Sequence, residues 1–156
     1  MSSPADVTIR RATRDEAEAI AALIRSAFDT EAHHYEGDPS RFERTEDVLA
    51  ALDAGDVMLV ARREGMLVGT VRGTAADGAV ELCRLSVSPD ARRLGIGRAL
   101  AEALETEYPE APYFELCAGS LSTDAIALYE SLGYEYVRSE ELEPGVTLVW
   151  LEKIAQ

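Results

Sequence analysis

The chain has 156 residues, the length of one ordinary domain, so we expect a single domain over residues 1–156. Acidic residues outnumber basic ones by 29 to 15, and no basic block occurs, which disfavours nucleic acid as a partner. The two cysteines form no CxxC pair, and we recognise neither a secretory leader nor an apolar run of membrane-spanning length. We therefore expect a cytoplasmic protein that has no membrane partner.

The first third of the chain predicts a strand followed by helices. Residues 7–11 alternate apolar and polar side chains, and Thr13 with Glu16 forms a capping box for a helix with apolar spacing from residue 20 to 28. No period holds over residues 29–44, which predict a loop or an irregular helical piece. Thr45 then caps a short helix through residue 52.

The middle of the chain predicts an antiparallel meander. Strands are expected over residues 57–62, 66–74 and 79–87, with turns at 63–65 and at Asp77-Gly78. After Pro89 a helix begins near Gly97, and a buried strand follows over residues 113–117. A strand, a helix and a strand in this order predict a right-handed crossover between parallel strands.

The C-terminal part predicts one more helix and a closing hairpin. The helix carries its apolar face at spacings of three and four residues and stops at Gly133. The hairpin strands are expected over residues 134–139 and 146–153. The whole pattern predicts one α/β domain with a mixed sheet.

Residues 92–98 read Arg-Arg-Leu-Gly-Ile-Gly-Arg and carry the pattern RxxGxG between a strand and a helix. Glycines at such a turn let backbone N–H groups at the positive end of the helix approach an anion such as a pyrophosphate. The Walker pattern fails because no Gly-Lys-Ser/Thr follows, and the dinucleotide fingerprint fails because Leu100 replaces its third glycine. A glycine-bearing turn without a ligand would explain this motif equally well if it stood alone.

Two flanking segments add to the motif. The preceding strand and turn, residues 81–92, read Glu-Leu-Cys-Arg-Leu-Ser-Val-Ser-Pro-Asp-Ala-Arg, and residues 122–134 read Ser-Thr-Asp-Ala-Ile-Ala-Leu-Tyr-Glu-Ser-Leu-Gly-Tyr. Together they resemble the GNAT superfamily of acyl-CoA-dependent N-acyltransferases. This resemblance implies a mixed, mostly antiparallel central sheet flanked by helices, with a splayed parallel strand pair that forms the acyl-CoA cleft. It also implies acetyl-CoA as the acyl donor and a primary amine as the acceptor.

The resemblance implies which residues hold the donor. Backbone N–H groups from 94–98 would hold the pyrophosphate, and the CoA arm would lie between residues 85–87 and 114–117. A bulge near Ser86 would direct an N–H group at the thioester carbonyl. The implied cofactor-binding residues are Leu85, Ser86, Val87, Arg92, Arg93, Leu94, Gly95, Ile96, Gly97, Arg98, Ser122 and Tyr129. Ser122 departs from the family's frequent asparagine, although serine can still cap the helix or bond the arm.

Two residues are implied to be catalytic. Tyr129 matches the tyrosine usually assigned as general acid for the leaving thiolate, whereas its helical spacing alone favours a core role. Glu81 stands where some family members place a base that takes the proton of the amine. An ordinary solvated glutamate and a water relay are the alternatives at this position.

No metal is expected, because the adjacent His33 and His34 make a poor ligand pair. His33, His34 or Tyr35 could contact the acceptor, and a loop surface is the simpler reading. Cys83 could serve as an acyl-accepting nucleophile, but strand burial explains it better.

The acceptor can be a small-molecule amine or a protein amine, and the acyl chain can be acetyl or longer. Many proteins of this fold pair, so a homodimer is an open expectation. The alternatives to an enzyme are a non-catalytic acyl-CoA-binding regulatory module and an unrelated interaction domain.

Overall fold

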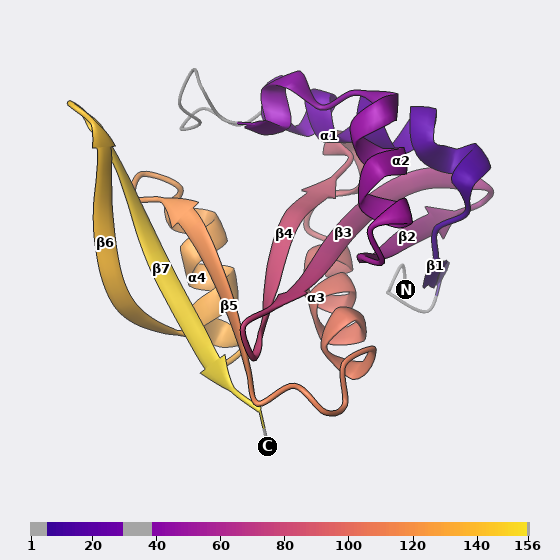
Figure 1. Ribbon diagram of the computed structural model, residues 1–156. Coiled ribbons are helices and arrows are strands. Elements are labelled where there is room, and N and C mark those ends of the chain that lie inside the picture. The colour runs from indigo at the N-terminus through magenta and orange to yellow at the C-terminus, as the bar shows by residue number, and fades with distance from the viewer. Residues whose placement is uncertain (1–5, 30–38, 156) are drawn as a thin grey trace.

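The computed structural model describes residues 6–29 and 39–155, and its strands form one seven-stranded sheet in the order β1-β2-β3-β4-β5-β7-β6 (Figure 1). His33, His34 and Tyr35 lie outside the described residues. In chain order the elements are β1 (Val7–Arg11), η2 (Arg14–Glu16), α1 (Ala17–Asp29), η3 (Pro39–Phe42), α2 (Thr45–Asp53), β2 (Val57–Arg63), β3 (Met66–Ala76), β4 (Ala79–Val87), η4 (Pro89–Ala91), α3 (Ile96–Thr106), β5 (Tyr113–Gly119), α4 (Thr123–Ser131), β6 (Glu135–Glu143) and β7 (Val146–Ile154). The expected element order, the meander and the parallel crossover are confirmed.

Tight turns fix the register of the meander. Glu64 and Gly65 join β2 to β3, and Asp77 and Gly78 join β3 to β4, and all four have positive φ angles between 53° and 83°. Two consecutive residues with positive φ give the hairpin turn whose twist matches that of the flanking strands. The Asp77-Gly78 turn predicted from the sequence is therefore confirmed.

Two apolar clusters lie on opposite faces of the sheet. The larger one joins α3 and α4 to the sheet and includes Val71, Leu82, Leu100, Leu104 and Leu116. The smaller one joins α1 and α2 to the other face through Ile20, Ile24, Val48, Met58 and Val60. Because side chains of a strand alternate between faces, both clusters can draw on the same strands.

Some boundaries differ from the prediction. β3, β5 and β6 extend beyond their predicted ends, to Ala76, Gly119 and Glu143. Arg44, rather than Thr45, is the N-cap residue of α2, and its backbone N–H donates to Asp47 Oδ2 at 2.9 Å. Among the residues that the structure describes, no helix is both long and apolar enough to cross a membrane.

The sheet opens between its two parallel strands. β4 pairs with β5 only from Ala79 opposite Tyr113 to Glu81 opposite Glu115, although both strands continue well beyond. Figure 1 shows the two strands adjacent at one end and diverging toward their carboxyl ends. β4 remains bonded to β3, and β5 remains bonded to β7, so each half of the sheet keeps its ladder.

A buried carboxylate, that of Glu16, bridges arginine side chains of β1 and β2. Glu16 is 6% exposed, and it accepts hydrogen bonds from the guanidinium groups of Arg10 and Arg62 at 2.8–3.0 Å and from the Thr13 N–H at 2.9 Å. The bonds from Arg10, more than any other interaction, hold the pKa of Glu16 well below its usual range. The predicted capping box is thus present, and its Glu16 also forms ion pairs with the two arginines.

We predict that Glu16→Gln lowers the free energy of unfolding by about 2–4 kcal/mol at pH 7, because two guanidinium groups lose their shared buried charge. Since the folded-state pKa of Glu16 is lowered, its stabilisation is present above the unfolded pKa of about 4.3 and is lost as the pH falls further. Urea unfolding at several pH values measures this. Asp53→Asn, which removes the exposed partner of Arg14, is the control and should cost less than about 1 kcal/mol. An equal cost for both variants would contradict the prediction.

Candidate active site

A β-bulge lies in β4 at the start of the open segment. Thr70 pairs with Ser86 and Arg72 pairs with Cys83, so Arg84 and Leu85 together stand opposite Val71. Arg84 has a φ of 55°, an uncommon conformation for a residue with a side chain. Such an insertion bends its strand and disrupts the ladder, which is consistent with the divergence of β4 from β5. The bulge expected near Ser86 is present at the two preceding residues.

The end of β4 meets both C-terminal helices. Leu85 and Val87 are half-buried against the larger apolar cluster. A Cβ atom built on Gly97, in the first turn of α3, would come within 3.6–3.9 Å of side chains of Leu128, Val87 and Leu85. The fold therefore brings together the segment around residues 85–87, the glycine loop and α4, as the resemblance implied.

The loop before α3 presents backbone N–H groups. Arg93 and Gly95 have positive φ angles of 66° and 80°, and Gly95 is the N-cap residue, without a side-chain cap. The first helical bond is donated by Ala99 to the Gly95 carbonyl, so the N–H groups of Ile96, Gly97 and Arg98 lie ahead of the helical ladder. Donors in this arrangement form an anion-binding concavity at the positive end of a helix.

The three arginines of this loop have different surroundings. Arg92 donates from Nε to the Val87 carbonyl at 3.3 Å and so ties the loop to the end of β4. Arg98 is exposed and bonds Ser131 Oγ on α4, which joins the two helices. Arg93 is exposed at the loop surface.

Tyr129 lies on α4 and is 8% exposed. Its ring meets that of Tyr134 edge to face, with the ring centres 6.0 Å apart and the planes at 65°. The Tyr134 hydroxyl donates to Glu105 Oε2 at 2.9 Å, and Lys153 Nζ lies 2.8 Å from Glu105 Oε1. Sequence reasoning missed this network, although the single lysine of the chain was a signal.

Ser122 is the N-cap residue of α4, but its hydroxyl makes no capping hydrogen bond. Of the two roles that its sequence position left open, the structure does not show the cap. The other role, a bond to the CoA arm, stays a prediction.

Glu81 stands where the parallel pairing ends, directly beside Glu115 of β5. Burial raises the pKa of Glu81, the negative charge of Glu115 raises it further, and Arg84 opposes both effects. Glu81 is four residues before Leu85, or roughly 13 Å along an extended strand. The side chain of Glu81 is half-buried where the pairing of β4 with β5 ends, and its role as a base stays a prediction.

Sequence reasoning missed a buried ion-pair cluster on the same face. Glu43, which precedes α2, is 2% exposed and accepts from Arg72 at 2.7 Å and from Arg84 at 3.1 Å. Cys83 is near both arginines, and burial raises the pKa of its thiol to about 11, so it is not a thiolate nucleophile at neutral pH.

Within residues 6–29 and 39–155, no cluster of His, Cys, Asp and Glu side chains could hold a metal ion.

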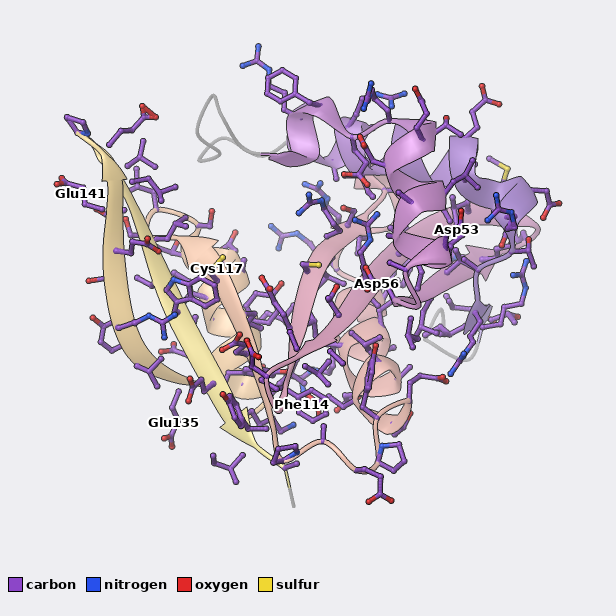
Figure 2. All side chains as sticks on the ribbon, viewed as in Figure 1. Asp53, Asp56, Phe114, Cys117, Glu135 and Glu141 are labelled. Atoms are coloured by element: carbon purple, nitrogen blue, oxygen red, sulfur yellow. The ribbon has the colours of Figure 1, made fainter. Side chains whose placement is uncertain are left out.

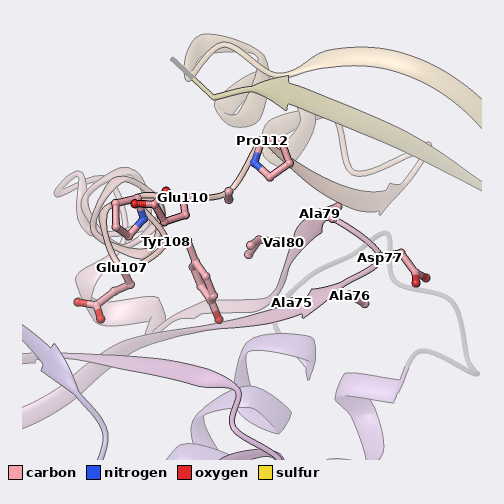
Figure 3. A pocket seen from close by; sticks show the side chains of 12 residues that line it. Ala75, Ala76, Asp77, Ala79, Val80, Glu107, Tyr108, Glu110 and Pro112 are labelled. Atoms are coloured by element: carbon pink, nitrogen blue, oxygen red, sulfur yellow. The ribbon is translucent and has the colours of Figure 1, made fainter.

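A separate cavity of about 540 Å³ lies at the paired end of β4, lined by residues 75–80 and 107–112 (Figure 3). It contains none of the predicted site residues. Tyr108 borders it and donates its hydroxyl to the Gly73 carbonyl at 2.9 Å. This cavity is therefore not where the sequence predicts the site.

We predict that Glu115→Gln lowers the pKa of Glu81 and leaves it above its ordinary value, because the repulsion is removed and the burial remains. Carboxyl ¹³C NMR titration measures the shift. Glu152→Gln is the matched control, because Glu152 pairs with Glu115 from β7 and is one strand further from Glu81. A pKa of Glu81 that does not respond to Glu115→Gln would contradict this account.

Known proteins share this chain's sequence pattern. The profile of the acetyltransferase (GNAT) family matches residues 17–134. The N-acetylaspartate synthetase of Xenopus tropicalis is 36% identical over 106 residues, which cover 64% of this chain and 39% of that protein. The UPF0157 protein YqkA of Bacillus subtilis (strain 168) is 29% identical over 122 residues, which cover 77% of this chain and 34% of that protein. The chain thus spans between a third and two fifths of the length of these curated relatives.

Solved structures share the fold. That of yncA, a putative acetyltransferase from Salmonella typhimurium with its cofactor acetyl-CoA, superposes with a TM-score of 0.78 at 22% identity. The superposition covers 96% of this chain and 94% of that one. The fold and the family profile agree with the strand, loop and helix described above, and the chain belongs to the GNAT acetyltransferase family.

Proposed function

We propose that the protein is an N-acetyltransferase that moves an acetyl group from acetyl-CoA to a primary amine by direct attack in a ternary complex. The observation that carries this proposal is the juxtaposition of an uncapped helix start with the bulged end of β4, where β4 and β5 diverge. Membership of the acetyltransferase family supports it, as does a relative named for an N-acetylated product.

The donor side is built mainly from backbone. The N–H groups of residues 94–98 would hold the pyrophosphate, with Arg92 and Arg93 lining the loop and Arg98 beside it. Leu85, Ser86 and Val87 would pair with the CoA arm, and Ser122 would bond it from the start of α4. An N–H group of the bulge would stabilise the negative charge that develops on the thioester oxygen. When bound, acetyl-CoA supplies the acyl carbon that the amine attacks.

The acceptor side contains Glu81. An amine is protonated at neutral pH, so a base must remove a proton before the nitrogen can attack. We propose that Glu81 accepts this proton through water, because its position along β4 is too far from Leu85 for direct transfer. Its raised pKa brings the carboxylate closer to the operating pH of a base.

Tyr129 would donate a proton to the departing thiolate. Tyr129 belongs to the apolar cluster against which Leu85 and Val87 pack, which supports this role, and a phenol has the required donor. The Tyr134 hydroxyl donates to Glu105 Oε2 and belongs to the packing of the core.

Calorimetric titration with acetyl-CoA, followed by a free-thiol assay over a panel of amines, tests the proposal. Binding with amine-dependent thiol release is expected. Binding without release from any amine would reject the enzyme and indicate the regulatory module. Absence of binding would reject both readings.

We predict that Gly97→Ala weakens acetyl-CoA binding by about tenfold or more and leaves the fold intact. The added methyl group would meet only ordinary contacts, and alanine favours a helix by up to about 1 kcal/mol relative to glycine. The methyl group would nevertheless fill space that the resemblance assigns to the donor. Calorimetry and thermal unfolding measure the two effects. Unchanged affinity would remove Gly97 from the proposed site.

We predict that Tyr129→Phe lowers kcat by about 10²-fold or more and leaves acetyl-CoA affinity nearly unchanged. Tyr134→Phe is the matched control, because it also removes one buried phenol hydroxyl. The control should cost about 1 kcal/mol of stability and preserve kcat. Full turnover in Tyr129→Phe would show that Tyr129 is a core residue only.

A further inference from the structure

We infer that the acceptor amine carries a carboxylate, as an amino acid does, and that Arg84 with Arg72 recognises this carboxylate beside the bulge. The inference rests on the proposed function, because it assigns the substrate class of the same site. It concerns the face of β4 that is covered by α1 and α2, opposite the face that packs against α3.

The arginine pair concentrates positive charge within a strongly acidic protein. Arg72 and Arg84 share one carboxylate, that of Glu43, and Arg25 donates to the Glu43 backbone carbonyl at 2.6 Å. The chain as a whole has a net charge of −14. A site for a cationic acceptor would not place guanidinium groups here, because like charges in a half-buried site repel.

Arg72 has hydrogen-bonding capacity left over. Its residue surface is 8% exposed, and its buried Nε has no hydrogen-bond partner among the protein atoms. A buried guanidinium nitrogen without a partner is costly, so proteins rarely keep one without a reason. Arg84 is the more accessible of the two, with a side chain that is 25% exposed. A ligand can therefore reach Arg84 first.

The position of Arg84 connects this charge to the proposed chemistry. Arg84 is one of the two bulged residues and immediately precedes Leu85, which the resemblance assigns to the CoA arm. Glu81 and Cys83 share one face of β4, and Arg72 pairs with Cys83 from β3. Arg84 and Arg72 both bind the carboxylate of Glu43, so Arg84 reaches toward this same face. Arg84 also influences the pKa of Glu81. Arg84 thus lies between Glu81, the proposed base, and Leu85, which is proposed to contact the CoA arm.

An α-amino acid carries its nitrogen and its carboxylate on one carbon atom, so a carboxylate held by Arg84 would leave the nitrogen beside Leu85, and Glu81 would take the proton through water. Arginine binds carboxylates through a planar array of donors, and such charge-assisted bonds are among the stronger ones in proteins. Asp47 near Arg72, and Asp56 near Cys83, are the further acidic groups in electrostatic reach. Glu43 Oε1 accepts from Arg84 Nε at 3.1 Å and helps to position its guanidinium group.

The test compares acceptors that differ only in the carboxylate. L-alanine is paired with ethylamine, L-phenylalanine with phenethylamine and L-leucine with 3-methylbutylamine, and spermidine represents polycations. The kcat/KM of each is measured for the wild type, Arg84→Gln, Arg84→Lys and the control Arg14→Gln, whose arginine lies in an exposed pair with Asp53. Acetyl-CoA affinity is measured for each variant.

We expect the wild type to favour carboxylate-bearing amines by about 10- to 100-fold, the range of a charge-assisted hydrogen bond. Arg84→Gln should bring this ratio close to one, Arg84→Lys should retain part of it, and Arg14→Gln should retain all of it. Acetyl-CoA affinity should be the same in all four proteins. A wild-type preference for spermidine or for the decarboxylated amines would overturn the inference, as would an unchanged ratio in Arg84→Gln.

A second measurement separates this inference from the proposed function. N-acetyl-L-alanine and N-ethylacetamide are titrated by NMR into the CoA-loaded wild type and into CoA-loaded Arg84→Gln. Arg84-dependent binding of the carboxylate compound supports the inference even if no amine releases thiol. Equal binding of the two compounds overturns it, even if the protein proves to be an active acetyltransferase.

Discussion

The register change in β4 is the constraint on which the rest of the site depends. Two residues, Arg84 and Leu85, occupy the space of one opposite Val71, so the strand cannot continue straight beside β5. The pairing with β5 ends at Glu81, three residues before the bulge. The bulge thus lies in the part of β4 that is not paired with β5, where backbone N–H groups are not used in a ladder with that strand.

The bulge also distributes chemistry between the two faces of the sheet. Leu85 and Val87 pack toward α3 and α4, whereas Arg84 reaches Glu43 beside α2. In the side-chain view, Cys117 on β5 and Asp56 at the start of β2 lie on opposite sides of the region where β4 and β5 diverge (Figure 2). The α3 face offers glycines and backbone N–H groups, and the α1–α2 face offers charged side chains.

The sequence was sufficient for the order of elements because the signals for that order are local. The Asp77-Gly78 turn, the Thr13–Glu16 box and the apolar spacing of each helix are read within a few residues. The bulge was expected only from the resemblance. Arg84 has a positive φ angle, and the sequence has no glycine at this position that would have indicated one. The Glu43 cluster could not be predicted, because its partners are 29 and 41 residues away along the chain. The bond from Tyr134 to Glu105, which spans 29 residues, was missed for the same reason.

The proposed donor and acceptor sites differ in the same way: the donor site is built from a local motif, and the acceptor site from residues that are distant in the sequence. The donor is the same molecule wherever it is used, and a loop that holds it through backbone N–H groups requires mainly glycines at fixed spacing. The acceptor must be distinguished from other amines, which requires side chains of particular charge held in place by a second set of contacts. In the recognition that we infer, those contacts would come from Glu43, which lies between η3 and α2 and thus outside the motif. If Glu43 positions the arginines that bind the acceptor, changes around Glu43 would alter which amine is accepted while the RxxGxG loop stays the same.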